Sequence, residues 1–160
     1  KDILDKAYNL PELKIFMLGD EVTNECLFPS QPWEIDMPMT DQIILGSKIM
    51  ADNLNVLSQY FTKITIHCVS GNHGRISKFH NPTTSWDYFF YKFCEASLQN
   101  NPRIEFIIEK NDWKQIIDIM GNKFLLFHGD RIKMQNRTPH YGIENAVARC
   151  VSMFNEDKIK

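Results

Sequence analysis

Short apolar segments alternate along this chain with longer segments whose apolar residues recur at helical spacing. Residues 13–18 (LKIFML) and 63–69 (KITIHCV) have the length and composition of buried strands. Between them, residues 40–61 place apolar side chains at a period of about 3.6, which predicts a long helix with one buried face. This alternation is typical of α/β domains, in which helices cover the faces of a sheet.

The second half of the chain refines this architecture. Thr84 and Asp87 have the spacing of a capping box, which predicts that a helix begins there. Residues 114–120 and 122–127 form two predicted strands joined through Gly121-Asn122, so the sheets are expected to be mixed rather than purely parallel. Two further helices are expected at 2–10 and at about 143–154, a further strand at 103–109, and a loop without regular structure at 20–39. The helix after Thr84 is expected to bury the face that carries Trp86, Phe89, Phe90, Phe93 and Leu98.

Composition excludes several classes of protein. The 160 residues suffice for one domain, and a net charge of −2 excludes a generally basic nucleic-acid binder. No apolar run approaches the roughly 20 residues that span a membrane, and no secretory segment opens the sequence, so a cytoplasmic location is expected. The four cysteines have no CxxC spacing, which favours reduced thiols packed as small apolar groups.

Polar side chains gather where three predicted strands end. The turns are Gly19-Asp20, Gly71-Asn72-His73-Gly74 and His128-Gly129-Asp130. Each alone has an ordinary explanation, since Gly-Asp often caps a turn and a single histidine is often a core residue. Together they predict a site, because ligands bind at the carboxyl ends of strands and glycine lets the backbone approach them closely. A carboxylate, an amide oxygen and an imidazole suit Mn²⁺, Fe²⁺, Zn²⁺ or Mg²⁺ better than Ca²⁺.

These motifs resemble the calcineurin-like metallophosphoesterase superfamily. Its pattern is D-x-H, G-D, G-N-H, a lone H and G-H-x-H, and the central three correspond to Gly19-Asp20, Gly71-Asn72-His73 and His128-Gly129. The stretches LGDEVTNE, SGNHGR and LLFHGD are most similar to the phage and bacterial DNA-repair-exonuclease-like branch. The resemblance implies an α/β/β/α sandwich of mixed sheets covered by helices, in a bacterial or phage-infected cell.

The resemblance also implies roles for individual residues. Asp20 would bridge two divalent metal ions, Mn²⁺ foremost, while Asn72 and His128 would be further metal ligands. His73 would be the catalytic group that stabilises or protonates the leaving oxygen, because imidazole donates protons near neutral pH. The substrate-binding candidates are Arg75, which could grip a phosphate oxygen, and His140, whose predicted loop follows His128.

Two family motifs do not occur in these residues. No D-x-H precedes Asp20 and no G-H-x-H follows His128. We therefore expect residues 1–160 to be a single metallophosphoesterase-like domain that is truncated at both ends, with one partly built and one nearly absent metal site. The alternative is a catalytically inactive relative of the same fold that serves as a scaffold or regulatory subunit.

The predicted function is metal-dependent hydrolysis of phosphodiester bonds, as in a nuclease or phosphodiesterase, by two-metal activation of water. DNA is a candidate substrate because basic residues follow the motif strands. A nucleotide-binding module without hydrolysis is disfavoured, since neither GxxxxGK[ST] nor GxGxxG occurs. The basic residues are Arg75, Lys78, Arg131, Lys133 and Arg137, and weaker site candidates are Asn24, Glu25, His67 and His80.

Overall fold

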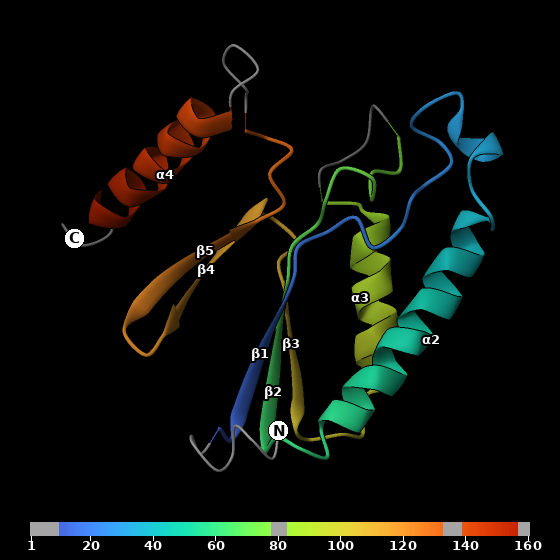
Figure 1. Ribbon diagram of the computed structural model, residues 1–160, viewed down its shortest axis with the longest axis horizontal. Helices are drawn as coiled ribbons and strands as arrows, with labels where there is room; N and C mark the ends of the chain where they lie inside the picture. Colours follow the sequence, from blue (N-terminus) through green and yellow to red (C-terminus); the bar gives the residue numbers. More distant parts are fainter. Residues whose placement is uncertain (1–9, 78–82, 133–138, 157–160) are drawn as a thin grey trace. The chain divides into compact units, whose positions relative to one another are not determined.

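The computed structural model of the chain describes residues 10–77, 83–132 and 139–156 (Figure 1). The chain divides into two compact units, residues 1–128 and residues 129–160. The first unit contains both sheets and the helices that accompany them, and the second contains helix α4 (Pro139–Glu156). The helix predicted at 2–10 lies almost wholly outside the described residues.

A parallel sheet of three strands forms the centre of the first unit. Its strands β1 (Glu12–Met17), β2 (Lys63–Cys68) and β3 (Ile104–Ile108) lie in the order β1-β2-β3, with Ile66 opposite both Ile15 and Phe106. All residues of β2 after Lys63 are buried, as expected for a central strand covered on both faces. The three carboxyl ends therefore meet at one edge of the sheet.

Helices α2 (Met39–Leu57) and α3 (Trp86–Ser97) cover one face of this sheet (Figure 1). Their apolar faces complete the core together with the inward side chains of the strands. The chain then has a mixed α/β fold, as the alternation of segments predicted. The core includes Met17, Val22, Met39, Ile43, Ala51, Leu54, Ile64, Ile66, Cys68, Phe90, Tyr91, Cys94 and Leu98.

A hairpin covers the opposite face of the sheet (Figure 1). Strands β4 (Lys114–Ile119) and β5 (Asn122–Phe127) pair antiparallel, which confirms the hairpin predicted from the sequence. Met120 and Gly121 have φ of 53° and 80°, as a tight two-residue turn between twisted strands requires. No helix among the described residues is both long and apolar enough to cross a membrane.

The start of α3 differs from the prediction. Ser85, not Thr84, is the N-cap, and its hydroxyl accepts the Asp87 backbone N–H at 3.2 Å. The predicted capping box is therefore wrong, and the Asp87 side chain is directed elsewhere. The predicted inner face is also partly wrong, because Phe89 and Phe93 are 43% and 50% exposed.

Three boundaries also differ from the sequence predictions. The predicted loop at 20–39 contains a short 3-10 helix, η1 (Gln31–Trp33), which Pro32 can join because proline suits the first turn of a helix. Helix α2 ends at Leu57, four residues early, where Ser58 caps it by donating its N–H to the Leu54 carbonyl. Helix α4 begins at Pro139, so His140 belongs to a helix rather than to a loop.

Candidate metal centre

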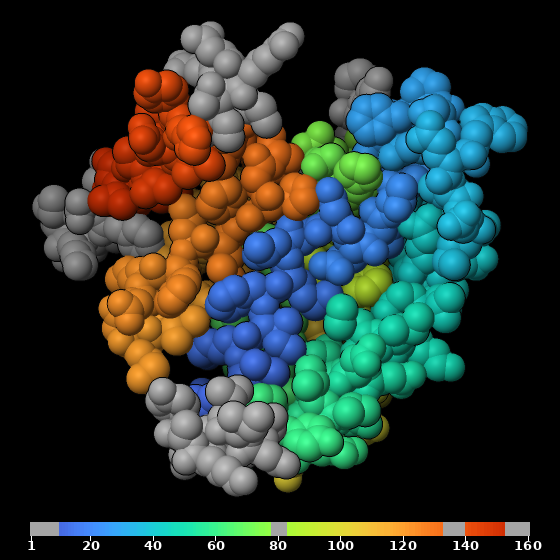
Figure 2. Space-filling view, viewed as in Figure 1, coloured from blue at the N-terminus to red at the C-terminus, as the bar shows by residue number. Residues whose placement is uncertain are grey.

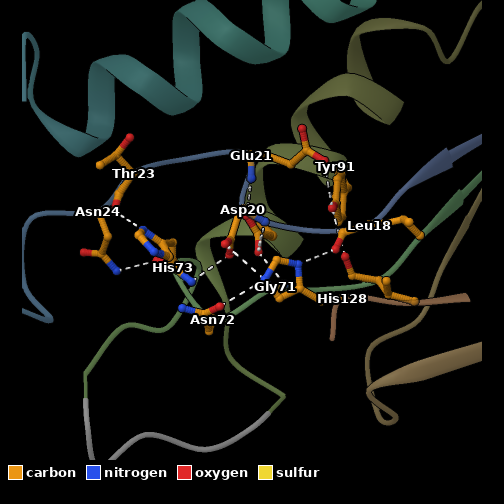
Figure 3. A network of polar contacts seen from close by, with 12 residues as sticks. Leu18, Asp20, Glu21, Thr23, Asn24, Gly71, Asn72, His73, Tyr91 and His128 are labelled. Atoms are coloured by element: carbon orange, nitrogen blue, oxygen red, sulfur yellow. Dashed lines mark hydrogen bonds and ion pairs between the residues drawn. The ribbon is translucent and has the colours of Figure 1, made fainter. Parts of the chain in front are cut away.

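Three polar side chains from three separate strand ends converge at the carboxyl edge of the sheets. Asp20 follows β1, Asn72 follows β2 and His128 follows β5. The Nε2 atom of His128 lies 3.0 Å from Asp20 Oδ2 and 3.0 Å from Asn72 Oδ1 (Figure 3). The structure thus brings together the three residues that the sequence predicts as metal ligands.

The hydrogen bond of the other ring nitrogen of His128 indicates which form of the imidazole is present. Its Nδ1 lies 2.8 Å from the Leu18 carbonyl oxygen, which can only accept, so Nδ1 holds the proton. In the neutral imidazole, Nε2 then directs a lone pair toward a carboxylate and an amide oxygen. Three acceptors that face one point are stabilised by a positive charge between them, either a second proton on the ring or a cation. A histidine that donates one ring N–H to a backbone carbonyl and keeps a lone pair on the other ring nitrogen is the usual form of a metal ligand.

Two glycines allow the loops after β1 and β2 to approach. Gly19 has φ of 90°, and a Cβ atom there would lie 2.1 Å from the Gly71 nitrogen. A Cβ atom on Gly71 would lie 2.2 Å from Asp20 Oδ1. Asp20 itself has φ of 62°, a left-handed conformation that non-glycine residues rarely adopt and that concentrates at functional sites. Neither glycine can therefore carry a side chain while these loops keep their positions.

His73 lies against the same carboxylate. Its backbone N–H donates to Asp20 Oδ1 at 2.8 Å, and its Nδ1 donates to the Thr23 carbonyl at 2.9 Å (Figure 3). The fully buried Asn24 ties the two loops by donating to the carbonyls of His73 and Arg75 at 2.7 and 2.5 Å. This arrangement leaves His73 Nε2 as the ring atom that can exchange a proton with a ligand.

A buried carboxylate lies beneath the site. Asp87, which is fully buried, accepts backbone N–H groups from Asp20 at 3.3 Å, Glu21 at 3.0 Å and Gly71 at 2.8 Å. Burial raises the pKa of Asp87, and these backbone hydrogen bonds oppose that rise. Both of its oxygens accept hydrogen bonds, so the charged form suits the geometry.

Glu21 is the second carboxyl group packed beside the site. Burial raises its pKa to about 7, the hydrogen bond from Tyr91 lowers it, and the nearby charges of Asp87 and Asp20 raise it. The Tyr91 hydroxyl lies 3.2 Å from Glu21 Oε1 and 3.0 Å from the Val69 carbonyl oxygen. Three carboxyl groups, those of Asp20, Glu21 and Asp87, therefore lie close enough to affect one another.

The hairpin carries His128 to this edge, and a buried polar contact holds the hairpin in place. Gln115 of β4 donates to the carbonyls of Cys68 and Ile107 at 2.7 and 2.9 Å. Its Oε1 faces Nδ1 of the buried His67 at 3.0 Å. Because Gln115 lies opposite Leu126 in the hairpin register, this contact fixes the end of β5 that leads into His128.

The cluster is open to the outside. The side chains of His128 and Asp20 are 19% and 29% exposed, and Figure 2 shows the blue loop after β1 beside the green loop after β2 at the surface. A cleft of about 420 Å³ adjoins Asp20 and runs to helix α2. It is lined by acidic and apolar side chains, among them Glu34, Asp36, Leu45 and Ile49. A ligand thus has access to the Asp20 side of the cluster.

The remaining predicted residues have varied positions. Arg75 is half-buried in the loop after β2, where its backbone pairs with that of Ser85 in an isolated antiparallel β-bridge. His140 and Arg131 are exposed residues of the second unit, and His67 is a buried residue behind the sheet edge. Glu25 follows Asn24, whose Oδ1 accepts its N–H. Lys78, His80, Lys133 and Arg137 lie outside the described residues.

Sequence reasoning missed Asp87 and Gln115. Asp87 was assigned to a capping box, although an acidic residue among the aromatic side chains of a buried helix face was an available signal. Gln115 gave a weaker signal, a glutamine at an apolar position of a strand. Both are polar residues on core-facing positions, where a side chain must find partners.

Within the described part of the chain, no three His, Cys, Asp or Glu side chains gather as a metal-binding group. The cluster at the sheet edge contains two such residues, Asp20 and His128, and completes its donor set with the amide of Asn72. No family model matches the sequence, and neither a curated protein nor a solved structure matches it.

Proposed function

We propose that this chain belongs to a metal-dependent phosphoesterase that hydrolyses phosphodiester bonds. The observation that carries the proposal is the convergence of acceptors on His128, whose Nε2 faces Asp20 and Asn72 at 3.0 Å while its Nδ1 is held by a carbonyl. A carboxylate, an amide oxygen and an imidazole nitrogen form a donor set that Mn²⁺, Fe²⁺, Zn²⁺ and Mg²⁺ accept. The α/β/β/α sandwich and the metallophosphoesterase family, which the resemblance of the G-D, G-N-H and H motifs implies, are part of the same proposal.

The residues present fit one divalent cation at the sheet edge. Asp20, Asn72 and His128 would hold it, and Asp20 would be the group shared with a second cation. Such ions bind a phosphodiester, supply positive charge to the reacting phosphate and activate water. His73, held by its backbone N–H on Asp20 and by Nδ1 on Thr23, would deliver a proton from Nε2 to the leaving oxygen. Arg75 stays a candidate for a phosphate contact, and the role of His140 stays a prediction from the sequence.

The cleft beside Asp20 bears on the substrate class. Its described lining contains Glu21, Glu34 and Asp36 and neither Lys nor Arg. A polyanionic strand that ran through it would meet like charges. The cleft therefore favours a compact phosphodiester, or the end of a nucleic acid, over a long duplex laid along this face.

The second candidate is a non-catalytic scaffold of the same fold. In that case the cluster would be a polar contact that stabilises the sheet edge, and substitution of Asn72 or His73 would leave function intact. The acidic cleft and the exposed aromatic side chains of α3 would then serve contacts with other proteins.

The decisive experiment titrates Mn²⁺ into the chain by calorimetry. The variants are Asp20→Ala and His128→Ala, with Asn101→Ala as the control at the opposite end of the sheet. We expect binding in the original chain and the control, and its loss in both site variants. Equal binding in the site variants, or no binding at all, would overturn the metal assignment.

Hydrolysis separates an enzyme from a scaffold that binds metal. In the phosphoesterase to which this chain belongs, we expect Mn²⁺-dependent cleavage of a dinucleotide, whose poor alkoxide leaving group needs a proton, with kcat lower by about 10²–10⁴-fold in His73→Ala, the range for loss of a general acid. A metal-binding chain whose phosphodiester cleavage is unchanged by His73→Ala would contradict the catalytic role of His73.

A further inference from the structure

We propose that Asp87 is the positioning residue of the metal centre: its carboxylate locks the loop that carries Asp20 to the loop that carries Asn72. The inference rests on the proposed function and extends it to a residue on a separate element, helix α3. Asp87 contacts no ligand atom of the cluster and acts through backbone groups alone.

The geometry distinguishes Asp87 from an ordinary helix-start acid. Its Oδ2 accepts from Gly71 at 2.8 Å and from Asp20 at 3.3 Å, so a single oxygen bridges the loops after β2 and β1. Its Oδ1 accepts from Glu21 at 3.0 Å. One carboxylate thus fixes the backbone of a metal ligand, of the residue after it, and of the residue before Asn72.

The loop after β2 packs closely against this carboxylate. A Cβ atom on Gly74 would lie 2.3 Å from Asp87 Oδ2 and 2.6 Å from Ser85 Oγ. The loop after β2 therefore closes over the carboxylate, and Asp87 is fully buried. Three N–H donors around a buried carboxylate require it to be an acceptor at both oxygens, which an amide cannot match because one of its atoms is a donor.

The consequence for the site follows from the backbone of Asp20. That residue has φ of 62°, a left-handed conformation that residues with a side chain rarely adopt. The hydrogen bonds that Asp20 and Glu21 donate to Asp87 oppose its relaxation. If the backbone of Asp20 relaxed, its carboxylate would no longer point toward His128 and the His73 N–H. The three proposed metal ligands would then no longer face one point.

The test separates positioning from helix stability by a matched pair of variants. Asp87→Asn keeps the shape and removes an acceptor, while Ser85→Ala removes the N-cap hydroxyl of the same helix and none of the three hydrogen bonds that Asp87 accepts from the loops. Asp87→Glu keeps the charge on a longer side chain. Each folded variant is titrated with Mn²⁺ by calorimetry, and its amide exchange and His128 imidazole ¹⁵N resonances are recorded without metal.

We expect Asp87→Asn to weaken Mn²⁺ binding about 10–100-fold, the usual range for residues that orient metal ligands. Exchange should accelerate at the amides of Asp20, Glu21 and Gly71, and the His128 ring resonances should shift. Ser85→Ala should lower the melting temperature yet keep the Mn²⁺ affinity and the His128 resonances. The Mn²⁺ affinity of Asp87→Glu should lie between that of Asp87→Asn and that of Ser85→Ala.

Two outcomes would overturn the inference: a His128 spectrum in Asp87→Asn that matches that of the original chain, or an equal loss of Mn²⁺ affinity in Ser85→Ala. Failure of the original chain to bind Mn²⁺ would instead overturn the proposed function. In that event the ring resonances and the amide exchange still decide whether Asp87 positions Asp20 against His128.

Discussion

The two ends of the parallel sheet differ in how one cluster of polar side chains is paired. At the amino end, the Asn101 amide donates to Asn55 Oδ1 at 3.0 Å and to Ser58 Oγ at 2.8 Å, and the Arg103 guanidinium donates to the Ser58 carbonyl at 2.9 Å. Every one of these contacts joins a donor to an acceptor. At the carboxyl end, His128 Nε2 meets two acceptors, Asp20 Oδ2 and Asn72 Oδ1.

This difference in pairing distinguishes a contact that stabilises the fold from a candidate ligand-binding site. A matched donor and acceptor stabilise the chain without any ligand, typically by about 0.5–1.5 kcal/mol. Hydrogen-bond acceptors that face one another do not stabilise the fold, whereas a cation bound between them does. Such clusters are therefore expected at functional sites, where residues are retained for activity at a cost in stability. The left-handed backbone of Asp20 at the carboxyl end fits the same view. Substitutions at the two ends should therefore have different effects on stability and on metal binding.

The largest effect is expected from Gly19→Ala at the carboxyl end. Its new Cβ atom would lie 2.1 Å from a backbone nitrogen, and φ is 90°, so both packing and backbone strain oppose it. We expect a loss of about 3 kcal/mol or more in the free energy of unfolding, measured by urea denaturation. Gly121→Ala is the matched control, since φ is 80° there and nothing lies within 4 Å. It should cost only the backbone term of about 1–2 kcal/mol, and equal losses would refute the proposed close approach of the loops.

The next largest effect is expected from Gln115→Ala, which breaks the contact that holds the hairpin to the sheet. Two backbone carbonyls and the His67 ring would lose a buried partner, at a cost of about 2–3 kcal/mol. Because the hairpin carries His128, Mn²⁺ affinity should fall as well. Asn122→Ala, an exposed position at the tip of the same hairpin, should change both quantities little. A Gln115→Ala variant that loses stability but keeps full affinity would show that His128 is held by other contacts.

A smaller effect is expected from Asn101→Ala at the amino end. It removes the donors to Asn55 and Ser58 and the acceptor for the Arg103 N–H, which together should cost about 1–2 kcal/mol in urea denaturation. Calorimetry should find the Mn²⁺ affinity unchanged, because these groups lie at the other end of the strands. A drop in Mn²⁺ affinity would mean that the amino and carboxyl ends of the sheet are coupled and would contradict their separate roles.

The elements were predictable because their signals are local. The apolar run of β2 and the turn at Gly121 each specify their own conformation, and both predictions are confirmed. The prediction of the α3 N-cap was wrong by one residue, because Thr84 and Ser85 are both capping residues and the spacing of Thr84 and Asp87 favoured the first of them. The prediction of the inner face of α3 was wrong for Phe89 and Phe93, which are exposed.

The ligand types in the candidate site were predictable, but their supports were not. Gly19, Asp20, Asn72 and His128 belong to short motifs at strand ends, which sequence displays directly. Asp87 acts on backbone groups 16 to 67 residues away along the chain. No local pattern encodes such a contact, so only the folded chain reveals it.

The most direct test of the central claim compares thermal unfolding of the original chain with that of Asp20→Asn, at pH 8, with and without Mn²⁺. The pH is above the range in which imidazole side chains ordinarily gain a proton. In Asp20→Asn the new amide can donate to His128 Nε2 while its oxygen keeps the His73 N–H. The account predicts that the metal-free variant is at least as stable as the original chain.

Saturating Mn²⁺ should stabilise the original chain by about 2.7 kcal/mol at a hundred times its dissociation constant. The same Mn²⁺ concentration should leave Asp20→Asn almost unchanged. A metal-free variant that melts well below the original chain, together with equal Mn²⁺ stabilisation of both, would show that the cluster is a structural contact and would contradict the metal centre.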